Sequence, residues 1–185
     1  GHPDLILIEP QNQTIQIYHS AEYLKVLENV TAIISNTEIN NAIEQSIGEI
    51  TTEEATKFVQ TTAEVAKQIS TPLRTLDVSD KSVLSLSFSY LGSKTVKNFL
   101  VYDKIPKEFA LSSDDIIVSA QDASVYVTEK DPSYTIKYSE LLPGQKVKIS
   151  YTVNERVNPS VINLTSFIFL AEEFVEEEIC AQVIT

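Results

Sequence analysis

Cysteine, methionine, tryptophan and glycine are scarce or absent in this chain, which has one Cys, no Met, no Trp and 4 Gly. The single thiol, Cys180, cannot form an intrachain disulfide, and it cannot supply the ligand pairs of a zinc ribbon. So few glycines argue against a glycine-rich phosphate loop and against a dinucleotide-binding turn. Stability must therefore come from packing, and we expect no cofactor.

Long apolar runs are missing too. The longest candidate, 161–171, is interrupted by polar residues and is shorter than the roughly 20 apolar residues that cross a bilayer. The chain opens with Gly1-His2-Pro3 and contains no Met, which we interpret as a tag-cleavage remnant in front of a piece excised from a longer protein. We expect any secretion signal or membrane anchor to belong to the parent protein, outside this piece.

Positive charge is in short supply. Lys and Arg number 14 against 26 Asp and Glu, which gives a formal net charge of −12 and a pI near 4.5. Binding to nucleic acid relies on neutralising phosphates with cationic side chains, so the field of this chain opposes it. Anionic membrane surfaces are disfavoured for the same reason. We therefore expect no nucleic-acid partner.

The remaining composition is that of an ordinary globular protein. The chain has 185 residues, of which 43% are hydrophobic and 22% charged, with 8 Tyr and 7 Phe. This length fits one domain, or a small domain with an appended helical piece.

The first 72 residues predict two strands followed by helices. Apolar runs over 4–9 and 13–18 indicate strands or extended arms, and helical spacing from Ser20 predicts a helix to about Ser35. A second helix is expected from a Thr37 cap to Gly48. The third has the strongest pattern, because Thr51-x-x-Glu54 is a capping box and an apolar stripe follows it as far as Ile69, before Pro72.

After Pro72 the pattern changes to the two-residue period of strands. The firmest strands are 83–90 and 146–153, where apolar residues alternate with Ser, Thr or Lys. Pro143-Gly144 predicts a type II turn before the second of them. Further strands are expected at 96–105, 116–119, 125–128, 134–138 and 161–170, with a weaker one at 179–184. Short strands at this spacing behind a helical block predict an α+β protein, a helical N-terminal segment attached to an antiparallel β-sandwich.

Landmarks between Asn98 and Asn154 point to a family. They are VYDKIPKEFA at 101–110, SDDI at 113–116, DPSY at 131–134 and LPGQ at 142–145, which runs into ISYTV at 149–153. In these segments the chain resembles the immunoglobulin-like β-sandwich modules of archaeal cell-surface and S-layer-like proteins, where an xIPKxFA segment ends a strand and an LxPGxxxxISY segment leads into another. The resemblance covers about a third of the chain.

The resemblance implies an extracytoplasmic, non-catalytic module, with a membrane anchor expected in the parent protein. The change of pattern after Pro72 predicts a division into an N-terminal strand arm and helical subdomain, residues 1–72, and a β-sandwich, residues 73–185, which the resemblance makes immunoglobulin-like. Independently of the family, Pro106 lacks the N–H that a strand ladder needs, so this segment is expected to end a strand.

Groups suited to catalysis are few, and we assign no catalytic residue. His19 is the only histidine beyond the N-terminal remnant, and a partly exposed position at a helix start explains it. Cys180 follows Glu176, Glu177 and Glu178, whose carboxylates would raise the pKa of the thiol, so a structural thiol is expected.

Carboxylate clusters are the remaining candidates for chemistry. They include Glu172, Glu173, Glu176, Glu177, Glu178, Asp77, Asp80, Asp114, Asp115 and Asp131. Calcium favours oxygen-rich loops, but no segment has the Asp spacing and central Gly of an EF-hand. A solvated acidic edge is the better explanation of these clusters. A pair of glycosidase carboxylates could be drawn from any two of them, because the sequence does not give the distance between carboxylates. Whether the chain has a metal site stays open.

Sequons at Asn12, Asn29 and Asn163 would suit an extracytoplasmic protein. The leading expectation is therefore a structural or protein-recognition module of a cell-surface protein, whose partner is another protein or a second copy. A strand at 5–8 donated to a second copy would be one route to assembly. The alternative is a ligand- or calcium-binding sensor domain of a membrane receptor, and a hydrolase with paired carboxylates ranks last.

Overall fold

The computed structural model describes residues 5–9, 14–18 and 34–176. The chain begins with β1 (Leu5–Glu9) and β2 (Thr14–Tyr18), and the helices α2 (Asn36–Ser46) and α3 (Thr52–Ala66) follow. The rest is strands with two 3₁₀ turns: β3 (Leu73–Val78), β4 (Ser82–Ser89), β5 (Val96–Lys104), η1 (Ser113–Asp115), β6 (Ile117–Ala120), β7 (Ser124–Glu129), β8 (Ser133–Leu141), β9 (Lys146–Val153), η2 (Pro159–Leu164) and β10 (Ser166–Phe174).

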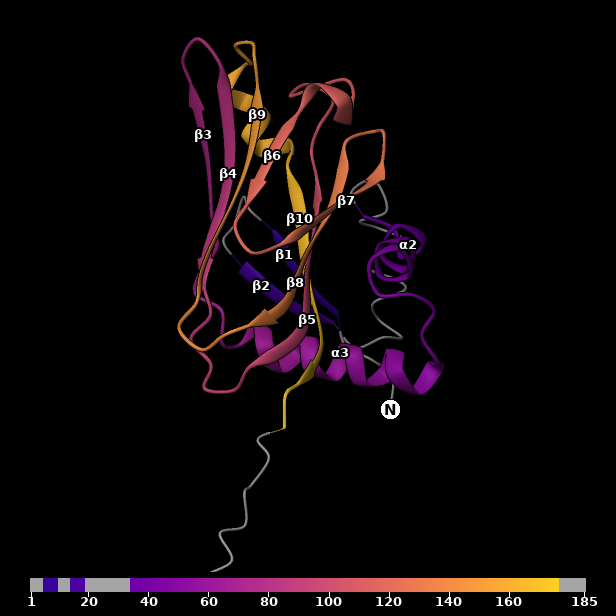
Figure 1. Ribbon diagram of the computed structural model, residues 1–185. Coiled ribbons are helices and arrows are strands. Elements are labelled where there is room, and N and C mark those ends of the chain that lie inside the picture. Colours follow the sequence, from indigo (N-terminus) through magenta and orange to yellow (C-terminus); the bar gives the residue numbers. More distant parts are fainter. Residues whose placement is uncertain (1–4, 10–13, 19–33, 177–185) are drawn as a thin grey trace, which may run out of the picture.

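The strands form two antiparallel sheets that pack face to face (Figure 1). A six-stranded sheet has the order β2-β1-β10-β5-β8-β7, and a four-stranded sheet has the order β3-β4-β9-β6. The main hydrophobic core lies between them and is rich in aromatic rings, among them Phe88, Phe99 and Phe169, whose centroids lie 4.6–5.8 Å apart. The expected α+β class with an antiparallel sandwich of two sheets is confirmed.

The strands with alternating sequence have one face in the core and one face outward. On β9, Val147, Ile149, Tyr151 and Val153 are buried, and this strand has the bounds that its alternation predicts. β4 pairs with β9 along its whole length and alternates in the same way. The predicted turn before β9 is also present, since Gly144 has φ 76° and Gln145 N donates to Leu142 O over 3.0 Å.

The central strands β5 and β10 are buried on both faces, which explains their nearly continuous apolar sequences. One face of each strand joins the core between the sheets. On the other face, Leu100 and Tyr102 of β5 and Ile168 and Leu170 of β10 form a second cluster, which includes Phe58 of α3. The molecule therefore has three layers in this region: helices, six-stranded sheet and four-stranded sheet (Figure 1).

Helix α2 starts two residues earlier than the predicted cap, Thr37, would place it. Ser35 is the N-cap, and it forms a capping box with Glu38, so the expectation of a Thr37 cap was wrong. Ser35 is preferred because its hydroxyl accepts a hydrogen bond from the Glu38 N–H while the Glu38 carboxylate accepts one from the Ser35 N–H. Thr37 lies inside the first turn. Gly48 just after the helix has φ 109°, which suits the predicted C-terminal glycine.

Helix α3 confirms the predicted capping box, because Thr51 and Glu54 exchange both hydrogen bonds. The helix ends at Ala66 and not at Ile69, which instead forms an isolated antiparallel bridge with Tyr90. Ile69 is buried in the core between the sheets, so it continues the apolar stripe without continuing the helix.

Two segments differ from the sequence-based expectation. The strand predicted at 161–170 is a 3₁₀ turn, η2, followed by β10, because Pro159 at the start of the turn and the Asn158 side chain, which accepts from Ser160 N, favour a tight turn first. Strand β3 was not predicted, because its first inward residue is the charged Arg74.

An edge strand, β7, closes one side of the six-stranded sheet beside α2. Gln45 Nε2 of α2 donates a hydrogen bond to the backbone carbonyl of Val127 over 3.0 Å. The ladder between β7 and β8 is irregular between Val127 and Glu129.

Some expectations fall on residues that the structure does not describe, namely most of the helix predicted at 20–35 and the strand at 179–184. Ile34 and Ser35 lie outside any helix. Strand β1 pairs with β10 of its own chain, which is an intramolecular partner and argues against its donation to a second copy. The boundary between residues 72 and 73, and the immunoglobulin-like class, stay predictions.

Candidate functional site

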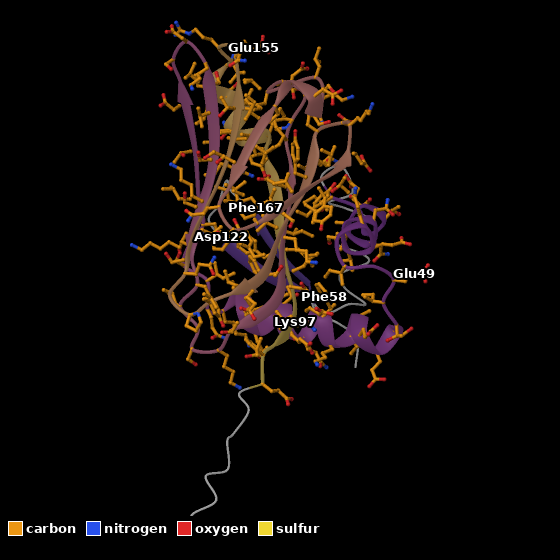
Figure 2. The ribbon with its side chains drawn as sticks, in the orientation of Figure 1. Glu49, Phe58, Lys97, Asp122, Glu155 and Phe167 are labelled. Atoms are coloured by element: carbon orange, nitrogen blue, oxygen red, sulfur yellow. The ribbon has the colours of Figure 1, made fainter. Side chains whose placement is uncertain are left out.

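A buried ion pair joins the two sheets. Arg74 of β3 donates from Nη1 to Asp103 Oδ2 over 2.9 Å and from Nη2 to Asp103 Oδ1 over 2.5 Å. The two side chains are 3% and 0% exposed, and the guanidinium also lies 5.1 Å from the centroid of the Phe167 ring. Figure 2 labels Phe167 between the two sheets. This bidentate geometry is a strong, specific contact that holds the edge strand β3 against the six-stranded sheet.

Unpaired polar atoms lie beside this ion pair. Arg74 Nε and Tyr151 Oη are buried without a hydrogen-bond partner in the part of the chain that the structure describes. Burial raises the pKa of Tyr151 well above its ordinary value, and the Asp103 carboxylate adds to this effect. Tyr151 therefore stays neutral beside the buried charge pair.

A second polar contact fixes α2 on the six-stranded sheet. Glu38 Oε1 accepts from Tyr102 Oη over 3.1 Å and from Lys104 Nζ over 2.9 Å, while its Oε2 caps the Ser35 N–H. Burial alone would raise the pKa of Glu38, but the hydrogen bonds from Lys104 and Ser35 lower it below its ordinary value. Burial raises the pKa of Tyr102. Glu38 is thus an ionised anchor between helix and sheet.

The predicted acidic edge is partly neutralised by cations. Glu173 of β10 forms ion pairs with Lys57 of α3 and with Lys97 of β5, and these bonds lower the pKa of Glu173. Glu172 accepts from Asn98 Nδ2 over 2.6 Å. Figure 2 places Lys97 beside α3 at the lower end of the view. The pairing favours a structural contact over a site for a free cation.

The other acidic candidates do not converge. Asp114 and Asp115 lie in η1, and Asp131 pairs with Lys107 over 3.4 Å. Among residues 5–9, 14–18 and 34–176, the structure brings together no group of three or more His, Cys, Asp or Glu side chains that could hold a metal ion. His19, Cys180, Glu177 and Glu178 lie outside the described residues.

The outer face of the four-stranded sheet carries a row of hydroxyl side chains. We call it the open sheet face; it consists of the outward residues of its four strands, Leu73, Thr75, Asp77, Val83, Ser85, Ser87, Ser89, Lys146, Lys148, Ser150, Thr152, Ile117 and Ser119. In the strand register, Thr75, Ser85, Ser150 and Ser119 lie opposite one another across all four strands. The hydroxyls of Ser85 and Ser150 are hydrogen-bonded over 3.0 Å.

The open sheet face contrasts with the other side of the sandwich. Helices α2 and α3 pack on the six-stranded sheet, whereas no described helix lies over the four-stranded one (Figure 1). Leu73 on β3 and Ile117 on β6 are 53% and 63% exposed, at opposite edges of this face. A sheet face that no described α-helix covers, with exposed apolar residues at both margins, is a candidate for contact with another molecule.

A hollow opens beside this face, where β8 of one sheet meets β9 of the other. We call it the inter-sheet hollow; it has a volume of about 510 Å³ and is lined by Gln121, Asp122, Tyr138, Glu140, Leu142, Gln145, Lys146, Val147 and Lys148. Asp122 lies in the turn between β6 and β7 and is labelled in Figure 2. Tyr138 is only 1% exposed, and its hydroxyl has no hydrogen-bond partner among the described residues.

Sequence reasoning did not find the residues of these sites. Arg74, Asp103 and Tyr138 are far apart in the sequence and acquire their roles only when the sheets meet. The sequon at Asn163 lies in η2 with its side chain exposed, and the other two sequons lie outside the described residues. Within the described residues no helix is long and apolar enough to cross a membrane.

Comparisons with known proteins give no family. No protein-family model and no curated protein matches the chain. Two structures of the yeast delta-COP-I mu-homology domain, one of them with a Dsl1 WxWxV peptide, match with a TM-score of 0.39 at 8% and 11% identity; each match covers 55% of this chain and 39% of the other. The chain thus spans well under half the length of these two.

A third solved structure is the chitin-binding domain of Chi18aC from Streptomyces coelicolor. It matches with a TM-score of 0.31 at 19% identity, over 50% of this chain and 84% of that domain. None of these structures is described as an archaeal or S-layer protein. At these TM-scores the likenesses carry no argument about this chain.

Proposed function

We propose that the chain is a non-catalytic structural or protein-recognition module, and that copies of it associate through the open sheet face. The observation that carries this proposal is the asymmetry of the sandwich. The outer side of the six-stranded sheet is covered by helices, while the four-stranded sheet presents exposed Leu73 and Ile117 around a hydroxyl row.

The chemistry of the row supports self-association. Thr75 and Ser119 are the exposed hydroxyls of the row, while Ser85 is buried and bonded to Ser150. A hydroxyl can both donate and accept a hydrogen bond, so the exposed ends of the same row on a second copy are complementary partners in a two-fold interface. Asp77 and Lys148 lie in the rows on either side of it, which gives the face charges of both signs in a chain of net charge −12. Association through this face therefore avoids the like-charge repulsion expected elsewhere on the surface.

The cellular setting is part of the same proposal. The sequence resemblance supports an immunoglobulin-like module of an archaeal-type cell-surface protein, outside the cytoplasm. An exposed sequon at Asn163 supports this setting, because a glycan there would point away from the core.

The test is light scattering coupled to size exclusion over a range of protein concentrations, with calcium and with a chelator. We expect an oligomer whose population rises with concentration and does not depend on calcium. Ile117→Asp places a charge in the contact and should abolish the oligomer. Val125→Asp is the matched control, since Val125 is exposed on β7 of the six-stranded sheet and does not belong to the open sheet face, so its variant should associate like the parent.

Two outcomes would contradict the proposal. A monomer at every concentration would exclude association through any face. A monomer that becomes more stable only with calcium would favour the alternative, a calcium-binding sensor domain.

A further inference from the structure

Tyr138 lies in an unusual position, because it lines the inter-sheet hollow while its buried hydroxyl has no hydrogen-bond partner among the described residues. A buried polar group without a hydrogen bond destabilises the fold, so most such groups in folded proteins are paired. Here the ring packs in the core against Phe99, with centroids 6.4 Å apart, which fixes the ring in place. The hydroxyl is therefore held ready for a partner that enters the hollow.

The charges around the hollow are of both signs. Asp122 and Glu140 supply carboxylates, and Lys146 and Lys148 supply ammonium groups. None of these four side chains is within ion-pair distance of another described charged residue, although other lysines, such as Lys57, Lys97 and Lys104, are paired. The hollow thus offers unpaired charge of each sign close to an unpaired hydroxyl.

The Asp122 carboxylate lies close enough to Tyr138 to act on its hydroxyl. Burial raises the pKa of Tyr138 to about 12, and the Asp122 carboxylate contributes to the rise. The hydroxyl is therefore neutral at physiological pH, keeps its acceptor lone pairs, and lies in the negative field of Asp122. Leu142 and Val147 supply apolar surface in the same hollow.

We propose that the inter-sheet hollow binds a small zwitterion of the amino-acid or dipeptide class. The ligand ammonium group donates to Tyr138 Oη and faces Asp122, while the ligand carboxylate faces Lys146 and Lys148. The volume of about 510 Å³ is within the usual range of small-molecule sites and is large enough for a dipeptide. The hollow shares Lys146 and Lys148 with the open sheet face, but ligand binding does not require association, so this inference goes beyond the function proposed above.

The probe is the dipeptide glycyl-leucine, titrated into the protein by calorimetry or by NMR. We expect saturable binding at one site. N-acetyl-glycyl-leucine lacks the ammonium group and glycyl-leucinamide lacks the carboxylate, so each should bind about tenfold more weakly or worse, as expected when a charge contact of about 1.4 kcal/mol is lost.

Variants of the protein locate the site. Tyr138→Phe removes one hydroxyl and should weaken binding about three- to tenfold, the loss expected for one hydrogen bond. Asp122→Asn should weaken it too, and because Asp122 has φ 57°, a conformation that Asn tolerates, the backbone should not change. Tyr134→Phe is the matched control, since the Tyr134 hydroxyl donates to Ser113 O and does not line the hollow, so binding should be unchanged.

The proposal is overturned by any of three results. These are no saturable binding of glycyl-leucine up to about 10 mM, equal binding of the two blocked dipeptides, or full binding by Tyr138→Phe. Because Lys146 and Lys148 also belong to the open sheet face, the titrations are repeated with Ile117→Asp, whose changed residue does not line the hollow. This variant should lose the oligomer and still bind the dipeptide, which keeps the two proposals distinguishable.

Discussion

Arg74 and Asp103 form a bidentate ion pair across the two sheets, and neither charge reaches solvent. Asp103 lies on the central strand β5, whereas Arg74 lies on the edge strand β3. A shift of β3 by one residue would turn Arg74 to the opposite face of the sheet, away from its partner. The pair therefore fixes the register of β3 as well as its contact.

Asp103→Asn should destabilise the fold by about 3–5 kcal/mol, because it leaves the Arg74 charge buried without a counter-charge. Urea unfolding monitored by circular dichroism measures the free energy of unfolding. Asp131→Asn breaks the exposed pair with Lys107 and should cost no more than about 1 kcal/mol. The double variant Arg74→Leu with Asp103→Leu should cost less than the sum of its single variants; equal or larger losses would show that the charges are not coupled.

Gly92→Ala should destabilise the protein by about 1–3 kcal/mol through overpacking. A Cβ at residue 92 would collide with the ring and hydroxyl of Tyr90 and with the Gln68 side chain. Tyr90 cannot move away easily, because its ring is buried and its hydroxyl donates to Lys94 O over 2.6 Å. The neighbouring exposed Ser93→Ala is the control, and an equal melting temperature for the two variants would refute the steric explanation.

Ser35→Ala should reduce the free energy of unfolding by about 0.5–2 kcal/mol, because it removes the N-cap of α2. Thr37→Ala changes the residue that the sequence pattern indicated as the cap, and it should cost little, since Thr37 is exposed within the first turn. Thermal melts of both variants decide between the two caps. A larger loss for Thr37→Ala would contradict the observed capping box.

Glu38 should make the fold sensitive to acid. Its folded pKa is below the ordinary value of 4.5, so its ionised form stabilises the folded state at pH above that value. This contribution should be lost as the pH falls through the folded pKa. Measured from pH 7 to pH 3, the stability difference between wild type and Glu38→Gln should therefore shrink. A difference that stays constant over this pH range for Glu38→Gln would refute the role of its charge.

Local patterns predicted the parts of the fold that depend on near neighbours. The alternation in β9 gave its bounds because one face of that strand is buried and the other is wet, and Thr51 and Glu54 predicted a cap because their partners are three residues apart. Strand β3 escaped prediction because a buried Arg74 is acceptable only with Asp103 opposite it, and that contact spans two sheets.

The candidate sites depend on tertiary structure even more strongly. Ser85 and Ser119 are unremarkable polar residues in the sequence, and only the register of β4, β9 and β6 places them in one row. Tyr138 has the sequence context of any core tyrosine. Its missing hydrogen-bond partner depends on how β8 meets β9, which no local pattern encodes.

The contact between Gln45 and Val127 has a consequence for the behaviour of the protein in concentrated solution. Strand β7 is an outer strand with exposed Val125 and Val127, and such a strand can recruit a strand of another molecule into amyloid-like stacking. The Gln45 amide donates a hydrogen bond to a backbone carbonyl of this strand, so that carbonyl is not free to pair with another strand. The register shift between Val127 and Glu129 also makes β7 a less regular surface for strand pairing. Resistance to aggregation therefore depends on α2 staying packed against β7. We expect the rate of aggregation during storage to follow the local opening of this helix rather than global unfolding of the protein.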